Sequence, residues 1–305
     1  MWRHVARTPL RPRPRAPDPK QMAGRSLSVL AHRHLVGIPS YEIAHSEQEL
    51  YRRSLLCSKA RRKFRVEEPL KPLLLSFEPE PTFSFGRRQD IPVGDEAARL
   101  LKPLRVDSVN KTFKPAVVST FRGGLTSYHG PGQLVLWPVV DLRSSLYPQF
   151  KTIRCYANLL QGATVRLLDW VFSIPTVTVE NEPGVWVVDN MSGPRRKIAS
   201  MGVHLRRHVA ALGVAINVHV SVTGGEHVNP WARFVPCGLE DRLVTSVAAE
   251  LGDRAPKEWD LSDVASRWAA IFDRGLIENR WRYIPQRPGS EKEVLRGKEF
   301  FANAG

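Results

Sequence analysis

The sequence predicts a single α/β domain, built on a mixed or mostly antiparallel sheet with packed helices. Short β-rich runs recur along the chain, and many of them are separated by Gly-Gly or Pro-Gly pairs. Only a few amphipathic helical patterns interrupt these runs, too few for the alternating units of a Rossmann sheet. The composition, with 42% hydrophobic and 25% charged residues, is that of an ordinary globular protein. No apolar run in the sequence approaches the length of a transmembrane helix.

The positive charge of the chain is unevenly distributed. Of the net charge of +15, residues 1–35 carry +7, and the rest of the chain carries +8. An Arg-rich, acid-poor start predicts a disordered mitochondrial targeting segment over residues 1–30, and therefore a mitochondrial location. A nucleic-acid-binding arm is the alternative. The folded domain is expected over residues 35–280, followed by a basic tail over residues 281–305.

The N-terminal half is predicted to contain one helix and three extended segments. The helix covers residues 42–62, and a short strand follows at Leu73–Phe77. The chain is extended again over residues 83–87. Residues 89–115 are polar with scattered Pro and Lys, which indicates a surface excursion. Residues 117–121 form the strand that leads into a glycine-rich loop.

The C-terminal half is predicted to contain three helices and four strands. An amphipathic helix covers residues 151–170, and Cys155 within it is expected to pack as a small hydrophobe. A second helix is expected to begin near Glu240, and a third has Asp260 and Asp263 placed as an N-terminal cap. The strands are expected at residues 176–179, 185–188, 197–203 and 214–220.

The segment from Arg122 to Leu142 is the first candidate for a functional site. It reads R-G-G-L-T-S-Y-H-G-P-G-Q-L-V-L-W-P-V-V-D-L, in which glycines and a proline surround Arg122, Tyr128 and His129. Glycines allow a tight bend or the close approach of a ligand, and these three side chains can hold a polar head group. The segment lacks the Lys and Ser/Thr of a phosphate loop and leads into a strand, so nucleotide binding is not expected.

Cys237 and Lys197 are the candidates for nucleophilic chemistry. Cys237 lies in F-V-P-C-G-L-E-D, directly before a predicted helix, whose N-terminus favours a thiolate. Lys197 begins an apolar strand, and an ammonium near a thiolate would stabilise it. The alternatives are an inert cysteine in a turn and a solvated lysine at the end of a strand. The three cysteines of the chain are too few for a disulfide framework, which indicates a reducing compartment or free thiols.

Metal ions and nucleic acids are not expected ligands. His204 and His208 are four residues apart, but their surroundings indicate a strand and a turn, and no third ligand is evident. The tryptophans are scattered rather than arranged as a stacking platform for single-stranded nucleic acid. The sequence therefore predicts no metal and no cofactor.

Several segments together resemble the lipoyl(octanoyl) transferase family. R-G-G-L-T-S-Y-H-G-P-G-Q resembles the R-G-G-x-x-T-Y-H-G-P-G-Q signature, and P-G-V-W with K-I-A-S-M-G resembles the P-G-V-W…K-I-A-x-x-G block. V-P-C-G-L resembles the cysteine loop, and L-L-L-S-F-E-P-E-P-T-F-S-F-G-R resembles the first strand pair. The resemblance covers about residues 35–275, with the motifs in the same order. It implies an α/β fold shared with lipoate and biotin ligases.

The resemblance also implies a site. Cys237 would be the acyl-thioester nucleophile, and Lys197 would lower the pKa of its thiol. The residues implied to line the acyl pocket are Arg122, Gly123, Gly124, Leu125, Thr126, Ser127, Tyr128, His129, Ser200, Met201, Gly202, Gly213, Val214 and Ala215.

The chain departs from the family pattern at several places. Ser127 stands where the family usually has Thr, and Leu212 stands where a histidine is common. The segment between Asn217 and Cys237 is longer than usual, and the basic stretches near residues 61 and 105 are additional.

The resemblance implies transfer of an octanoyl group through a cysteine thioester. The donor would be octanoyl-acyl carrier protein, and the acceptors would be the lipoyl domains of 2-oxoacid dehydrogenases and the glycine cleavage H protein. These partners are acidic, which suits the surplus positive charge. An ATP-dependent lipoate or biotin ligase of the same fold is the alternative, and a basic nucleic-acid-binding module is a more remote one.

Overall fold

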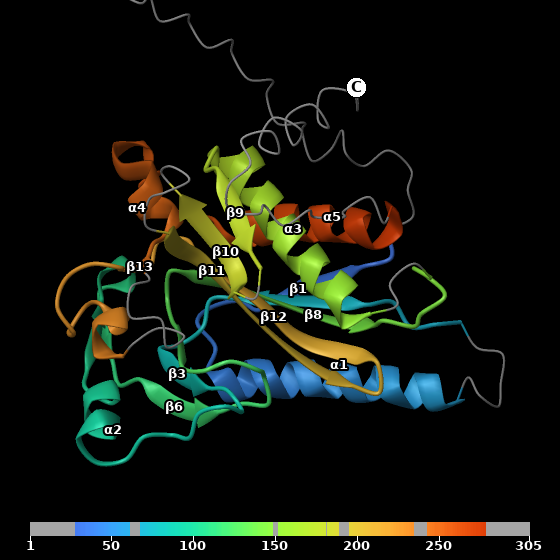
Figure 1. Ribbon diagram of the computed structural model, residues 1–305, viewed down its shortest axis with the longest axis horizontal. Helices are drawn as coiled ribbons and strands as arrows, with labels where there is room; N and C mark the ends of the chain where they lie inside the picture. Colours follow the sequence, from blue (N-terminus) through green and yellow to red (C-terminus); the bar gives the residue numbers. More distant parts are fainter. Residues whose placement is uncertain are drawn as a thin grey trace, which may run out of the picture.

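An eight-stranded mixed sheet forms the centre of the fold (Figure 1). Its strands are β1 (Ala31–His34), β2 (Leu73–Phe77), β8 (Gln133–Asp141), β9 (Thr176–Val179), β10 (Glu182–Val188), β11 (Arg195–Arg206), β12 (Val209–Asn217) and β13 (Leu243–Val244). The spatial order is β1-β2-β8-β12-β11-β10-β9, with β13 beside β11. The β1–β2 and β11–β13 pairs are parallel, and the other pairs are antiparallel. The prediction of an α/β fold with a mixed sheet is confirmed.

The structure is a computed structural model, and it describes residues 28–61, 68–148, 152–180, 182–188, 195–234 and 243–278. Most of the predicted targeting segment and all of the predicted basic tail lie outside these residues. The described chain is packed from its start, because the backbone N–H groups of Val29 and Leu30 donate to Asp273 Oδ1 at 3.1 and 2.8 Å. None of the helices in the described ranges is long and apolar enough to cross a membrane.

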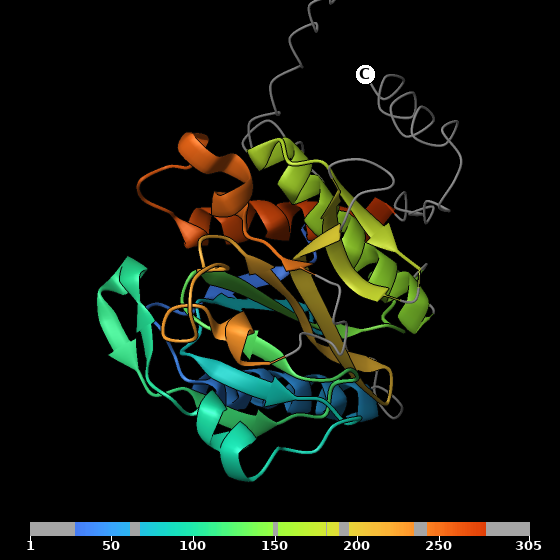
Figure 2. The same ribbon diagram turned by 60° about the vertical axis from the view of Figure 1, so that its left-hand side comes forward.

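Helices cover both faces of the main sheet (Figures 1 and 2). Helices α3 (Ile153–Phe172) and α5 (Leu261–Glu278) pack on one face, and α1 (Tyr41–Arg61) packs on the other. Successive residues of a strand point to opposite faces, so Leu134 packs with α3 and α5 whereas Val135 packs with α1. This two-sided burial explains why β8 is a continuous apolar run in the sequence.

A small three-stranded sheet lies beside the main one. It consists of β3 (Thr82–Phe85), β6 (Ala116–Ser119) and β7 (Ser127–His129), in the order β6-β3-β7. Alternation gives this sheet a polar face with Ser84 and Ser127, and an apolar face with Phe83 and Tyr128. Phe83 and Tyr128 pack in a cluster of their own, separate from the core of the main sheet.

Residues 89–115 differ from the expected polar excursion. They contain α2 (Gly94–Leu100) and a hairpin of β4 (Leu104–Val106) and β5 (Lys111–Phe113). Leu100 and Leu104 are buried in the same cluster as Phe83. The excursion is therefore a packed part of the fold, and its few apolar residues in a mostly polar segment did not predict this.

Two predictions about helices are wrong in detail. Leu243 and Val244 are not helical, because they pair with Arg196 and Lys197 as β13. The helix α4 begins only at Val247, after a Ser246 cap, while Glu240 itself lies outside the described residues. Cys155 is exposed rather than packed, because it lies in the first turn of α3 on the side away from the sheet core.

Candidate functional site

A cavity of about 500 Å³ lies between β11 and β12 of the main sheet and the polar face of the small sheet. Its volume falls within the usual range for small-molecule sites. Most residues that the sequence assigned to a site lie at its wall: Arg122, Gly123, Gly124, Leu125, Ser127, His129, Lys197, Ser200, Met201, Gly202, Gly213, Val214 and Ala215. The Arg122 loop and the hairpin of β11 and β12, which are about 70 residues apart in the sequence, therefore converge on one cavity.

Strand register brings β11 and β12 together. Met201 pairs with Val214, and Gly202 pairs with Gly213. Both glycines are required sterically, since a methyl group at Gly213 would collide with the Leu136 carbonyl oxygen. A methyl group at Gly202 would lie 2.8 Å from Arg122 Cδ. The missing side chain of Gly202 lets Arg122 lie directly against β11, and that of Gly213 lets β12 lie close to β8.

Arg122 is fixed against the small sheet by its guanidinium. Its Nη2 donates to the carbonyl oxygen of Ser84 at 2.6 Å and to Ser84 Oγ at 2.9 Å. Its Nη1 donates to the carbonyl oxygen of Gly123 at 3.1 Å. These contacts hold a positive charge at the cavity wall in a defined orientation.

His129 is neutral at physiological pH. Burial and the nearby Arg122 charge together lower its pKa to about 4, and a hydrogen bond to Gln133 opposes part of the shift. A neutral imidazole can donate one hydrogen bond and accept another. His129 can therefore orient a carbonyl or an amine without bringing a second charge beside Arg122.

Lys197 is buried at the cavity wall, with 7% of its surface exposed. Its Nζ lies 4.5 Å from the ring centroid of Trp186, within the range of a cation–π contact. Gly184 makes room for it, because a Cβ there would lie 2.6 Å from the Ala199 carbonyl oxygen and 3.3 Å from Lys197 Cε. The burial favours the inward-facing interpretation of this lysine over a solvated one.

Cys237 lies within residues 235–242, outside the described residues. The chain on either side is fixed near the site. Phe234 packs edge-on against Phe83 with ring centroids 5.6 Å apart, and Val244 pairs with Lys197 in the main sheet. The N–H of Thr245 also donates to the Lys197 carbonyl oxygen at 3.0 Å.

Thr126 and Tyr128 do not line the cavity, in contrast to the other described residues of the implied pocket. The backbone N–H and hydroxyl of Thr126 both donate to Gln89 Oε1, at 2.8 and 2.7 Å. The Tyr128 ring lies on the apolar face of the small sheet, where burial raises the pKa of its phenol. Alternation along β7 places Ser127 and His129 on the cavity side and Tyr128 behind them.

Comparison with known proteins identifies the family. Residues 54–273 match the family model described as the lipoyl protein ligase A/B catalytic domain. The chain belongs to this family.

Curated relatives of the family are named octanoyltransferases. One from Thermobifida fusca (strain YX) is 30% identical over 232 residues, which cover 73% of this chain and 86% of the relative. The mitochondrial octanoyltransferase of Saccharomyces cerevisiae is 29% identical over 60% of this chain. This chain spans only 54% of the yeast protein, and 64% of an octanoyltransferase from Paenarthrobacter aurescens to which it is 31% identical.

A solved structure to which the chain is similar is that of Ta0514, described as a putative lipoate protein ligase from T. acidophilum with bound lipoic acid. It aligns over 90% of this chain and 93% of that chain at 18% identity, with a TM-score of 0.44.

Further residues, which no sequence motif marked as part of a site, also line the cavity of this family member. Tyr41, Trp137, Glu182 and Leu212 line it. Trp137 belongs to an apolar run that predicts only core packing, and no local motif marks Tyr41 at the start of α1. Leu212 has a positive φ of 62°, which is unusual for a branched residue and has no sequence signal.

The two histidines considered as metal ligands lie in different surroundings. His204 stacks on Phe121, with ring centroids 5.5 Å apart, and its Nδ1 lies 2.9 Å from Arg52 Nη1. His208 lies in the β11–β12 turn with a positive φ of 67°.

Proposed function

We propose that this protein is an octanoyltransferase of protein lipoylation. It takes an octanoyl group from octanoyl-acyl carrier protein and transfers it to a lysine of a lipoyl domain. The observation that carries the proposal is the convergence of the Arg122 loop, β11 and β12 on one cavity with a buried Lys197 at its wall. Family membership and the names of the curated relatives support the same activity.

The octanoyl tail is proposed to occupy the apolar part of the cavity. Tyr41, Trp137 and Leu212 supply apolar wall, and about 500 Å³ is ample for a seven-carbon tail. Burial of that tail contributes about 5 kcal/mol gross, at roughly 0.8 kcal/mol per methylene. Arg122 and His129 supply the polar wall, where the acyl carbonyl would lie.

The reaction is proposed to proceed in two steps through Cys237. Its thiolate attacks the thioester carbonyl, a new C–S bond forms, and the carrier leaves as a thiol that has taken up a proton. The lysine amine of the lipoyl domain then attacks the cysteine thioester, forms the amide, loses a proton and releases the cysteine thiolate. Lys197 would stabilise the thiolate and exchange the protons, and no metal or nucleotide takes part in these steps.

The partners are proposed to be acidic domains, because the positive charge of this protein would attract them over a distance. The acceptors would be lipoyl domains of 2-oxoacid dehydrogenases and the glycine cleavage H protein. The +8 outside residues 1–35, together with Arg88 and Arg122 at the cavity, would steer their approach. The Arg-rich start of the chain and the mitochondrial yeast relative support a mitochondrial location.

The acyl-enzyme is the decisive species to look for. The protein is incubated with octanoyl-loaded carrier protein, without an acceptor, and its intact mass is measured. An octanoyl adduct labile to hydroxylamine should form on Cys237, and Cys237→Ser should abolish turnover. Lys197→Ala should shift iodoacetamide alkylation of the thiol to higher pH, because the nearby cation is lost. Cys57→Ala and Cys155→Ala serve as controls that keep activity, and an adduct on Cys155 would refute the assignment.

ATP dependence separates this function from a lipoate or biotin ligase, and the family description names lipoyl protein ligases. A ligase activates its acid as an adenylate and has no need of a nucleophilic cysteine. Transfer from octanoyl carrier protein to a lipoyl domain should therefore proceed in the absence of ATP. Strict dependence on ATP would establish the ligase instead.

A further inference from the structure

Two segments that depart from the family pattern pack against each other. Together, residues 94–113 and 224–234 form what is here termed the backing layer. Arg99 Nε donates to Glu226 Oε1 at 2.6 Å, and Arg99 Nη2 donates to the Ala232 carbonyl oxygen at 2.7 Å. The N–H of Arg105 donates to the His227 carbonyl oxygen at 2.8 Å. The two segments are therefore one structural unit, although they are more than 100 residues apart in the sequence.

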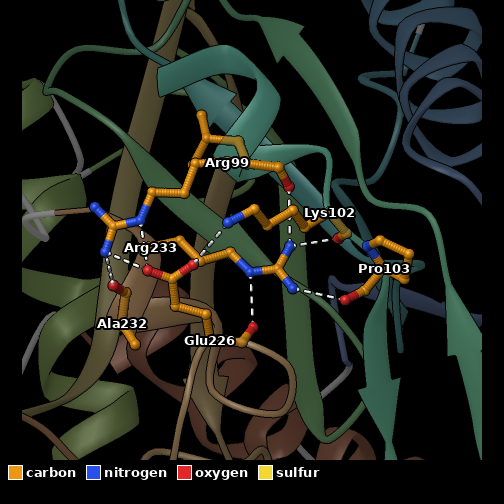
Figure 3. Close-up of polar contacts among 7 residues, drawn as sticks. Arg99, Lys102, Pro103, Glu226, Ala232 and Arg233 are labelled. Atoms are coloured by element: carbon orange, nitrogen blue, oxygen red, sulfur yellow. Dashed lines mark hydrogen bonds and ion pairs between the residues drawn. The ribbon is translucent and has the colours of Figure 1, made fainter. Parts of the chain in front are cut away.

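Arg233 is the buried centre of the backing layer, with 1% of its surface exposed. Figure 3 shows its guanidinium between the two segments, with dashed hydrogen bonds to both. Its Nε donates to the Glu226 carbonyl oxygen at 2.8 Å, which joins it to its own segment. Its two Nη atoms donate to the carbonyl oxygens of Leu100 at 3.0 Å, Lys102 at 2.6 Å and Pro103 at 2.9 Å. A planar guanidinium can make these divergent bonds at once, whereas the compact ammonium of lysine cannot.

The backing layer supports the small sheet from behind. Trp231 packs edge-on against Tyr128 with ring centroids 5.4 Å apart, and Phe234 packs against Phe83 at 5.6 Å. Tyr128 and Phe83 are the apolar face of the sheet whose other face carries His129 into the cavity. Any displacement of Tyr128 therefore moves its neighbour His129.

Apolar packing does not hold the layer by itself. A second cavity of about 250 Å³ lies between β4, Tyr128 and the chain around Val220 and Val228. Loosely packed elements can shift, because the attraction between apolar atoms falls steeply with a gap. The directional hydrogen bonds of Arg233 are thus the contacts best suited to fix the layer beside this gap.

We propose that Arg233 is a positioning residue for the reaction: it joins the two segments of the backing layer and so fixes the small sheet that carries His129 at the acyl cavity. The expected effect on KM and kcat rests on the proposed octanoyl transfer. The expected displacement of His129 is a structural effect and does not depend on that function. This assigns a role to the two segments that distinguish the chain from the common family pattern.

The test compares Arg233→Met and Arg233→Lys with two controls in the full chain. Leu55→Ala is the control for lost stability, since Leu55 is buried on α1 far from the backing layer. Arg99→Ala is the control for a more exposed contact within the layer. All variants are measured well below their melting temperatures, by NMR titration of His129 (assigned with His129→Gln), by calorimetric binding of octanoate, and by KM and kcat.

Arg233→Met should weaken octanoate binding at least tenfold, raise KM for the octanoyl donor at least tenfold, and move the His129 titration midpoint upward as water reaches the ring. Arg233→Lys should change the octanoate affinity, the KM and the His129 midpoint in the same direction by a smaller amount. If the Arg233→Met variant does not fold, the Arg233→Lys variant tests the proposal by the same three measurements. Leu55→Ala and Arg99→Ala should keep both the midpoint and the affinity within twofold.

The proposal is overturned if Arg233→Met loses stability as Leu55→Ala does and yet keeps the wild-type His129 midpoint and octanoate affinity. A wild-type protein that transfers no octanoyl group would refute the proposed function alone. The His129 titration would then still decide whether Arg233 positions the cavity wall.

Discussion

At the residue scale, the contact between Lys197 and Trp186 sets the surroundings of the proposed proton-transfer group. Trp186 is fully buried, and its backbone pairs with Lys197 across β10 and β11. The indole ring is thus held by the sheet, and the ammonium lies over its electron-rich face. A tryptophan ring attracts a cation more strongly than other aromatic side chains do.

Fluorination of Trp186 separates this electrostatic contact from packing. Replacement by tryptophans with an increasing number of fluorine atoms withdraws electron density from the ring with little change in its size. The catalytic efficiency kcat/KM should fall step by step along the series. The free energy of unfolding in urea should stay within about 0.5 kcal/mol, since the packing is nearly conserved. Equal efficiency in all members of the series would show that Trp186 acts only through its volume.

At the element scale, local patterns predicted most of the strands and helices. The limits of β2 and β9 agree with the predicted runs, and the Asp260 cap of α5 is confirmed by a hydrogen bond from the Asp263 N–H at 2.9 Å. The apolar run of a strand and the capping residue of a helix each extend over only a few neighbouring residues, so the sequence shows them directly. The strand β13 could not be predicted, because two residues acquire strand geometry only from their partner β11.

Removal of the Asp260 cap should destabilise α5 measurably. Asp260→Ala deprives the Asp263 N–H of its acceptor and should lower the free energy of unfolding by about 1 kcal/mol. Asp260→Asn keeps an acceptor oxygen and should cost only a few tenths. Asp263→Ala is the matched control in the same turn, since its ion pair with Arg267 is largely exposed and contributes little. Equal losses for Asp260→Ala and Asp260→Asn would contradict the capping role.

At the scale of the whole molecule, stability should depend on pH through partly buried histidines. Burial lowers the pKa of several of them below the ordinary value: His32, His34, His129, His204 and His219. The unfolded chain then binds more protons than the folded protein at acid pH. The stabilisation is complete above about pH 6.5 and is lost as the pH falls. For His129, with a pKa of about 4, this loss extends down to pH 4.

The free energy of unfolding should therefore decrease steadily when urea titrations are repeated from pH 7 to pH 5. His129→Gln should flatten this dependence most, because a group whose pKa falls from 6.5 to about 4 contributes on the order of 3 kcal/mol over the full range. Leu55→Ala, which removes no titratable group, is the control and should lower the free energy of unfolding by the same amount at every pH. A slope that His129→Gln does not alter would show that this imidazole is not the group that titrates.

Some residues of the candidate site could be predicted from the sequence alone, and others could not. Glycines marked the cavity wall: the missing side chain of Gly202 leaves room for the Arg122 side chain, and that of Gly213 leaves room for the Leu136 carbonyl oxygen. Tyr128 has the same local context as His129, but strand alternation turns it to the opposite face. The Arg233 contacts join residues about 130 positions apart, and no local pattern encodes a partner at that distance.

The exchange of partners along β11 has a consequence for how this chain can vary. β12 pairs with β11 as far as Ala199, and β13 takes over at Lys197, so the chain leaves the sheet after Asn217 and re-enters the same strand edge at Leu243. The anchor points of this detour are fixed by the sheet, whatever the length between them. Each doubling of a loop's length costs only about 0.6 kcal/mol in closure entropy. Outside the packed residues 224–234, the length between the anchors can thus change while Lys197 and the Arg233 contacts keep their places.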